Sequence, residues 1–253
     1  MLVSGVDAPV PVGTDAAVRA DLPVRGPGDP GLLIYTSGTT GRPKGALLSH
    51  GNLVAGIEAL RLAWRWSPDD RLTHTLPLFH LHGLGAGING TLHAGASVLL
   101  RPRFDPADVT ASARELGATL FFGVPTMYTR LAGHAGVVGL GGLRLCVSGS
   151  APLPPDVFAA IEAGSGQATL ERYGATETML TVSNPYDGER RPGTVGFPFP
   201  GVELRPTGAN LGFPANNVAM GDLDGFDHVA LVNNDAFVEP NWLAPPGGMT
   251  PSP

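Results

Sequence analysis

The chain has 253 residues, of which 43% are hydrophobic and 15% are charged, a balance typical of a globular, core-forming protein. Acidic residues outnumber basic ones by 22 to 16 and no block of Lys or Arg occurs, which argues against a nucleic-acid-binding surface. The sequence shows no basic, apolar leader and no uncharged apolar run of about 18 residues, so we expect no signal peptide, no membrane span and a cytoplasmic protein.

In chain order, a Pro-, Gly- and Ala-rich start is followed by a regular alternation of short apolar runs and helical patterns. Residues 1–30 are expected to be linker or loop. Strands are expected within 31–36, 71–78, 96–102, 118–125, 143–149 and 168–174. Helices are expected within 50–64, 82–95, 105–117, 125–132 and 153–164, with a further helical turn at 176–180. This alternation predicts an α/β fold built from parallel βαβ units.

Several polar residues mark the ends of the predicted helices. Either Ser49 or Asn52 can cap the helix at 50–64. Asp105 is positioned to cap the helix that follows it, and Gly117 is positioned to end that helix.

Other residues that could carry chemistry are expected to be structural. Cys146 lies in the apolar run LRLCVSG, which favours a buried core thiol. Two tryptophans, Trp64 and Trp66, are expected to pack at a helix end. No carboxylate or cysteine stands at metal-ligand spacing from three of the histidines, which are His74, His82 and His93.

The segment TSGTTGRPKG follows the first apolar run and suits a phosphate. Its backbone amides and hydroxyls can meet phosphate oxygens, and Lys44 adds a point charge. It is not a Walker A loop, because Pro43 precedes the lysine and Gly45 follows it, which disfavours a helix there. The alternative is an ordinary Gly/Thr turn after a strand.

Six ordered motifs carry a family resemblance over roughly residues 30 to 206. They are YTSGTTGRPKGALLSH, LPLFHLHGL, FFGVPTMY, VSGSAPL, ERYGATET and GTVGFPFPGVELR. In this order they resemble the adenylate-forming (AMP-binding) superfamily of acyl-CoA synthetases. The residues of two motifs, LPLFHLHGL and ERYGATET, are similar to those of malonyl-CoA synthetases. The resemblance implies the α/β large N-terminal domain of these enzymes, with parallel βαβ sheet layers.

The resemblance also implies ATP, Mg²⁺ and a carboxylic acid at one site, with CoA as the second substrate. The ATP phosphates would be held by Thr36, Ser37, Gly38, Thr39, Thr40, Gly41 and Lys44. The rest of the nucleotide would be met by Ser148, Gly149, Ser150, Glu171, Tyr173, Gly174 and Thr176, with Tyr173 stacked on adenine. For Ser148, Gly149 and Ser150 the alternative is that they line the acyl pocket. Glu177 would ligate Mg²⁺, and the catalytic set would be Lys44, His80, Thr176 and Glu177. The acid would be met by His80, Arg172 and Met179.

Arg172 carries the substrate hypothesis. A guanidinium inside an acyl pocket is costly unless an anion pairs with it, and the distal carboxylate of malonate is a fitting partner. The alternative is an exposed arginine, or one paired with Glu171.

The resemblance implies an incomplete domain. Only about thirty residues precede Gly31, and after Pro206 the family pattern gives way to other sequence. Residues 207–243 resemble a piece of a GT-A family-2 glycosyltransferase, in which Asp235 would help hold a metal and a sugar nucleotide, and 244–253 reads as a disordered tail. Lys44 is the only lysine, so nothing replaces the catalytic lysine that relatives carry downstream.

Three functions therefore stay open. The first is acid activation and CoA thioester formation, with little turnover expected from this chain alone. The second is a non-catalytic remnant or chimera. The third is a sugar-nucleotide-binding glycosyltransferase fragment. The sequence makes no prediction of oligomeric state.

Overall fold

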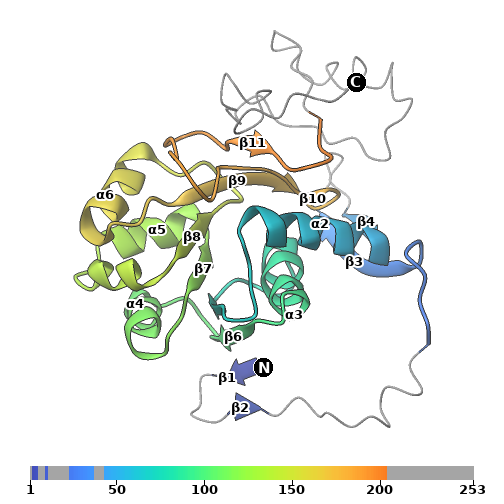
Figure 1. The fold of residues 1–253 in the computed structure, drawn as a ribbon, viewed down its shortest axis with the longest axis horizontal. Helices are drawn as coiled ribbons and strands as arrows, with labels where there is room; N and C mark the ends of the chain where they lie inside the picture. Colours follow the sequence, from blue (N-terminus) through green and yellow to red (C-terminus); the bar gives the residue numbers. More distant parts are fainter. Residues whose placement is uncertain (1, 5–8, 11–22, 37–42, 204–253) are drawn as a thin grey trace.

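The computed structural model describes residues 2–4, 9–10, 23–36 and 43–203 and shows a doubly covered, mostly parallel sheet (Figure 1). Within these residues the sheet has the strand order β11-β10-β9-β8-β7-β5-β6-β1-β2. Its strands are β1 Leu2–Ser4, β2 Pro9–Val10, β5 Arg71–His74, β6 Ser97–Leu100, β7 Leu120–Gly123, β8 Leu145–Ser148, β9 Leu170–Ala175, β10 Met179–Ser183 and β11 Phe197–Pro198. The pairs from β1–β6 through β8–β9 are parallel, whereas β2, β10 and β11 pair antiparallel. The predicted α/β class with a parallel sheet is confirmed.

Helices cover both faces of this sheet. One face carries α2 His50–Ala63, the π-helix η1 His82–Asn89 and the short α3 Gly90–His93. The other carries α4 Pro106–Glu115, α5 Pro125–Ala132, the 3₁₀ helix η2 Val137–Gly142 and α6 Pro155–Ser165. Side chains alternate along each strand, so Phe122 points to the first apolar layer and Phe121 to the second.

The predicted helix signals act as expected. Ser49 is the cap of α2, and Asn52 returns the hydrogen bond to the Ser49 amide, so both candidates take part in one capping box. The Asp105 side chain accepts the Ala107 amide at the start of α4. Gly117 follows α4 with φ +63°, a left-handed conformation that favours glycine.

The core residues also lie where the sequence places them. Trp64 and Trp66 follow the end of α2 and contact Phe122 edge-on, with ring centroids 5.4 and 5.3 Å away. Cys146 is fully buried on β8, and burial raises the pKa of its thiol to about 12. It is therefore a core thiol and not a nucleophile.

Two local predictions are wrong, and one strand was not predicted. Residues 1–30 include β1 and β2, so this range is not all loop, and β1 pairs in parallel with β6. The helical turn expected at 176–180 is instead the turn into β10, which pairs antiparallel with β9. Strand pairing with β9 outweighs the helical pattern of residues 176–180. The second strand of a separate hairpin, β4 Lys44–Ser49 beside β3 Pro30–Thr36, was not predicted.

The segment 82–95 is helical as predicted, but its first part is a π-helix packed unusually close to its neighbours. A Cβ atom on Gly87 would lie 2.5 Å from Cε1 of His74, and one on Gly90 would lie 2.7 Å from the Trp66 ring. The glycines therefore allow η1 and α3 to approach the sheet closely.

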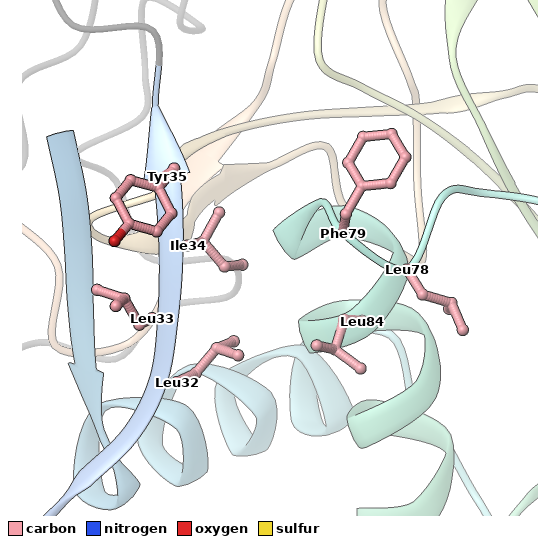
Figure 2. Close-up of a pocket in the computed structure, with 7 residues that line it drawn as sticks. All are labelled: Leu32, Leu33, Ile34, Tyr35, Leu78, Phe79 and Leu84. Carbon is pink, nitrogen blue, oxygen red and sulfur yellow. The ribbon is translucent and has the colours of Figure 1, made fainter. Parts of the chain in front are cut away.

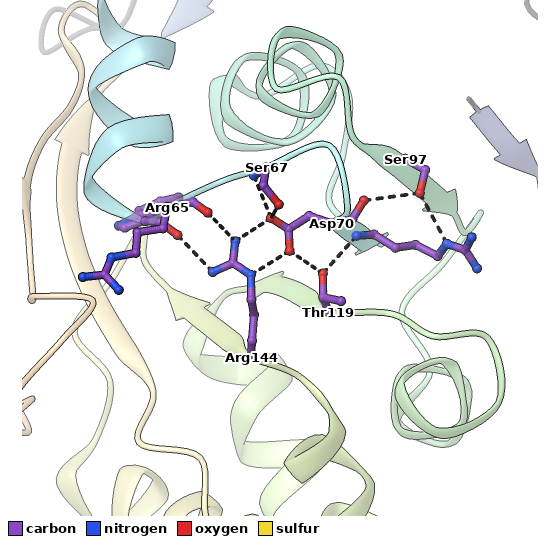
Figure 3. A network of polar contacts seen from close by, with 8 residues as sticks. Arg65, Ser67, Asp70, Ser97, Thr119 and Arg144 are labelled. Atoms are coloured by element: carbon purple, nitrogen blue, oxygen red, sulfur yellow. Dashed lines mark hydrogen bonds and ion pairs between the residues drawn. The ribbon is translucent and has the colours of Figure 1, made fainter.

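One buried ion pair ties α2 to the sheet (Figure 3). Nε and Nη2 of Arg144 each lie 2.6 Å from an oxygen of Asp70, and Arg144 also donates to the Trp64 and Arg65 carbonyls. Asp70 accepts further hydrogen bonds from Thr119 Oγ1 and the Ser67 amide. Burial alone would raise the pKa of Asp70, but the hydrogen bonds from Arg144 and Thr119 lower it.

Candidate functional site

The predicted phosphate segment spans the connection between β3 and β4, and its first and last candidates lie in these two strands. Thr36 pairs with Lys44, and Thr36 Oγ1 donates to the Lys44 carbonyl at 3.4 Å. Lys44 is exposed. The five other predicted phosphate residues lie outside the described residues and are Ser37, Gly38, Thr39, Thr40 and Gly41. The hairpin thus brings the two described candidates of this segment together.

A second hairpin, β9–β10, holds the next group of candidates. Tyr173 and Gly174 lie in β9, and the turn that follows contains Thr176 and the exposed Glu177. Met179 opens β10 with φ +59°, a strained conformation for a non-glycine residue. A Cβ atom on Gly174 would lie 2.0 Å from the Met179 carbonyl oxygen, so only glycine fits there.

Helix α2 packs against both hairpins. Met179 is buried in one apolar cluster with residues from β3, β4 and α2, which are Ile34, Leu48, Leu53 and Ile57, and with Leu81 before η1. Its sulfur lies against Gly56, where a Cβ atom would be 2.6 Å away. Figure 1 shows β10 beside α2, next to β3 and β4. The Lys44 and Glu177 hairpins therefore both pack on this helix.

The third group of candidates lies at the carboxyl end of β8. Ser148 is buried, and its hydroxyl has no hydrogen-bond partner among the described residues. Gly149 faces the Arg172 guanidinium so closely that a Cβ atom on it would lie 2.3 Å from Cζ. Ser150 is exposed and has φ +73°. Carboxyl ends of parallel strands are the usual place for ligands in α/β sheets.

Arg172 is buried, and no ion pair links it to another residue in the described part of the chain. Its side chain points to the η1 face of the sheet, the residue is only 6% exposed, and Nε and Nη2 have no hydrogen-bond partner within the described residues. Burial lowers the pKa of its guanidinium to about 10. The alternative of an exposed arginine, or of one paired with Glu171, is wrong. These unused donors are the strongest sign of an anionic ligand in the site.

Glu171 points to the opposite face and is engaged elsewhere. It is only 4% exposed, and its two carboxylate oxygens accept the amides of Leu153, at 3.1 Å, and of Gly193, at 2.9 Å. Burial raises the pKa of Glu171, although both amides act in the other direction. The residue predicted to meet the nucleotide therefore holds two loops of the protein itself.

Two histidines lie close to Arg172. His80 is exposed, and its Nδ1 accepts the His82 amide at 3.2 Å, so the neutral ring carries its proton on Nε2. The His82 ring is buried and stacks on Phe122, with centroids 6.3 Å apart, and neither ring nitrogen has a partner in the described part of the chain. Burial and the Arg172 charge lower the pKa of both histidines. Sequence reasoning missed His82 as a site residue, although its place two residues after His80 could have indicated it.

His74 supports a prediction on pH. Burial lowers its pKa from 6.5 to about 4, so between these values the folded protein binds fewer protons than the unfolded one. Stability from this group is therefore complete above pH 6.5 and is lost as the pH falls toward 4, by up to about 3 kcal/mol. We expect the free energy of urea unfolding to change less steeply with pH across this window in His74→Gln than in the unmodified chain. Equal slopes for His74→Gln and the unmodified chain would contradict this.

An apolar groove lies between the two candidate segments (Figure 2). It has a volume of about 390 Å³ and is lined by Leu32, Leu33, Ile34, Tyr35, Leu78, Phe79 and Leu84. Thr36 directly follows one wall in the chain, and His80 directly follows the other. None of these described lining residues is charged, so this part of the groove suits an apolar group.

Comparisons with known proteins show the family and the fold of the chain. The family model described as AMP-binding enzyme matches residues 5–216. The chain is 39% identical to a malonate–CoA ligase of Arabidopsis thaliana over 197 residues, covering 70% of this chain and 32% of that protein. The solved structure of ATP-bound MatB from Rhodopseudomonas palustris superposes with a TM-score of 0.66 at 48% identity, covering 70% of this chain and 35% of that one. The fold matches the N-terminal domain of acyl-CoA synthetases.

A further relative covers more of the chain. A sulfoacetate–CoA ligase of Cupriavidus necator is 36% identical over 257 residues, which is 96% of this chain and 50% of that protein. This alignment reaches into residues 207–243, whose predicted glycosyltransferase resemblance, Asp235 included, lies outside the described residues and is not supported by any of these relatives. The chain spans about a third of the length of the first two curated relatives it matches.

No helix in the described part of the chain is both long and apolar enough to cross a bilayer.

Proposed function

Because this chain belongs to the AMP-binding enzyme family, we propose that it serves the ATP-dependent activation of a malonate-like dicarboxylic acid. One carboxylate oxygen attacks the α-phosphorus of ATP, and the bond to pyrophosphate breaks to leave an acyl-adenylate. The thiol of CoA then attacks the acyl carbon, a thioester forms and AMP leaves. The cytoplasm is the compartment predicted from the sequence.

The position of each candidate residue suggests which part of the substrates it contacts. Lys44 and Thr36, with the segment between them, are assigned to the β- and γ-phosphates, and Thr176 to the α-phosphate. Tyr173, in β9, is assigned to the adenine ring. His80, with its proton on Nε2, can donate a hydrogen bond to the reacting carboxylate without adding a positive charge.

Glu177 suits the magnesium ion that such chemistry uses to offset phosphate charge. Its carboxylate is exposed, and the described residues contain no cluster of three or more His, Cys, Asp or Glu side chains that could hold a metal. Mg²⁺ is usually held by one or two carboxylates together with phosphate oxygens and water, so one exposed carboxylate is a sufficient protein contribution.

The observation that carries the substrate proposal is the buried guanidinium of Arg172, whose Nε and Nη2 have no hydrogen-bond partner among the described residues. A buried cation without an anion is unfavourable, and the distal carboxylate of malonate would supply a charge-assisted, two-pronged partner. Two relatives are named for malonate and sulfoacetate, acids that both carry a second anionic group. An acid with one negative charge would leave Arg172 unpaired.

Calorimetric titration of the chain in the presence of Mg-ATP tests this proposal. We expect saturable heat with malonate and at least about tenfold weaker binding of monomethyl malonate, which has nearly the same shape but lacks the second charge. Equal affinities for the two acids would contradict the assignment of Arg172. The absence of heat with any acid would contradict the activation function itself.

A further inference from the structure

Glu171 combines burial with contacts to two segments that are distant in the sequence. Its Oε2 accepts the amide of Leu153, and its Oε1 accepts the amide of Gly193. Leu153 ends the turn that leaves β8, whereas Gly193 lies in the loop between β10 and β11. The Glu171 carboxylate therefore links two loops that are distant in the sequence and are brought together by the folding of the sheet.

The contacts around Glu171 are reinforced through its backbone. The Glu171 carbonyl accepts the Asn184 amide at 2.9 Å and Asn184 Nδ2 at 3.2 Å, and the same Nδ2 donates to the Thr194 carbonyl. Gly196 packs so closely on Asn184 that a Cβ atom would lie 2.4 Å from its Cα. The 193–196 loop is thereby fixed, which makes it a rigid anchor for one end of the carboxylate.

The other end of the carboxylate holds a strained turn beside the proposed acid site. Ser150 has φ +73°, a conformation that costs a non-glycine residue on the order of 1 kcal/mol and persists only when its surroundings enforce it. The β8–β9 register pairs Ser148 with Glu171, so Gly149 falls next to Arg172, against whose guanidinium it packs. Holding Leu153 therefore also holds Gly149 in place.

We propose that Glu171 is a positioning residue for acid selection: it fixes the turn 149–153 so that Gly149 stays flat against the Arg172 guanidinium. This inference rests on the proposed function, because it concerns the arginine assigned to the distal anion. Two adjacent residues of β9 thus act from opposite faces of the sheet: Arg172 carries the charge, and Glu171 fixes the turn that packs against Arg172.

Glu171→Gln is the direct test, because it keeps the shape but replaces one acceptor oxygen with an NH₂ group that faces a backbone N–H. We expect the Leu153 and Gly193 amides to exchange hydrogen at least about tenfold faster while amides of β7 keep their protection. We also expect malonate to bind about tenfold more weakly, with the preference over monomethyl malonate reduced. Glu162→Gln, on the exposed face of α6, is the matched control and should change neither quantity.

Each outcome decides between a positioning and a merely structural role. A structural role would weaken both acids equally, so an unchanged preference, or unchanged exchange at the two amides, would overturn the proposal. If Glu171→Gln does not fold, Glu171→Asp keeps the charge but reaches less far, and an unchanged preference in that variant would overturn it equally. If the unmodified chain does not distinguish the two acids, the assignment of Arg172 in the proposed function fails, whereas an effect of Glu171→Gln confined to the amides refutes only the link to acid selection.

Discussion

Arg172→Met is expected to abolish the preference for a dicarboxylic acid while leaving the protein at least as stable as before. The unmodified guanidinium is buried, and two of its nitrogens have no partner among the residues that the structure describes, so its loss removes an unfavourable buried charge from the empty protein. In the complex the same loss leaves the distal carboxylate without its cation, which weakens malonate binding on the order of 100-fold. Titration calorimetry and thermal unfolding measure the two effects on one preparation.

The opposite signs of these two effects separate a ligand site from an ordinary structural arginine. If Arg172 had only a structural role, its replacement would destabilise the protein. The apparent affinity for malonate would then fall only in proportion to the folded fraction. Arg103→Met is the matched control, because Arg103 is exposed and should affect neither quantity. A destabilised Arg172→Met variant that still prefers malonate to its monomethyl ester would contradict the assignment.

Asp70→Asn is expected to cost about 3 kcal/mol of stability, which for a chain of this size lowers the melting temperature by roughly 10 °C. Asp70 is only 3% exposed, and Arg144 uses two nitrogens to contact it (Figure 3). Asparagine would keep the shape of Asp70 but leave the Arg144 guanidinium without its counter-charge. The same guanidinium also donates to the Trp64 and Arg65 carbonyls. Urea unfolding of the single variants and of the double variant Asp70→Asn/Arg144→Met gives the coupling energy.

The control for this prediction is an exposed ion pair. Arg114 and Glu115 lie 3.3 Å apart, with side chains 59% and 62% exposed, so Glu115→Gln should cost less than about 1 kcal/mol. We expect the double variant to recover part of the loss caused by Asp70→Asn. A cost similar to that of Glu115→Gln would show that the Asp70 network does not stabilise the fold.

Much of the fold could be predicted because its elements are long or strongly patterned. The alternation of apolar runs and capped helices indicated the parallel sheet, and the Ser49 and Asp105 caps follow from local chemistry alone. The turn at 176–180 was predicted wrongly because the conformation of Met179 depends on pairing with β9. The strand β1 was missed because it is short and pairs with β6, nearly a hundred residues away.

The candidate site divides in the same way. The motif residues could be identified from the sequence, and the structure brings Thr36 next to Lys44 and Gly149 next to Arg172. The engagement of Glu171 could not be predicted, because its partners Leu153 and Gly193 approach it only after three strands have paired. The unpartnered state of Arg172 likewise depends on which face of β9 it occupies.

The most direct measurement of the central claim is a crystal structure of this chain with malonate and a nucleotide. The account predicts one malonate carboxylate within hydrogen-bond distance of Arg172 Nε and Nη2, with the other carboxylate directed toward Thr176 and His80. A complex in which malonate lies elsewhere while the Arg172 guanidinium keeps its unpartnered nitrogens would contradict it.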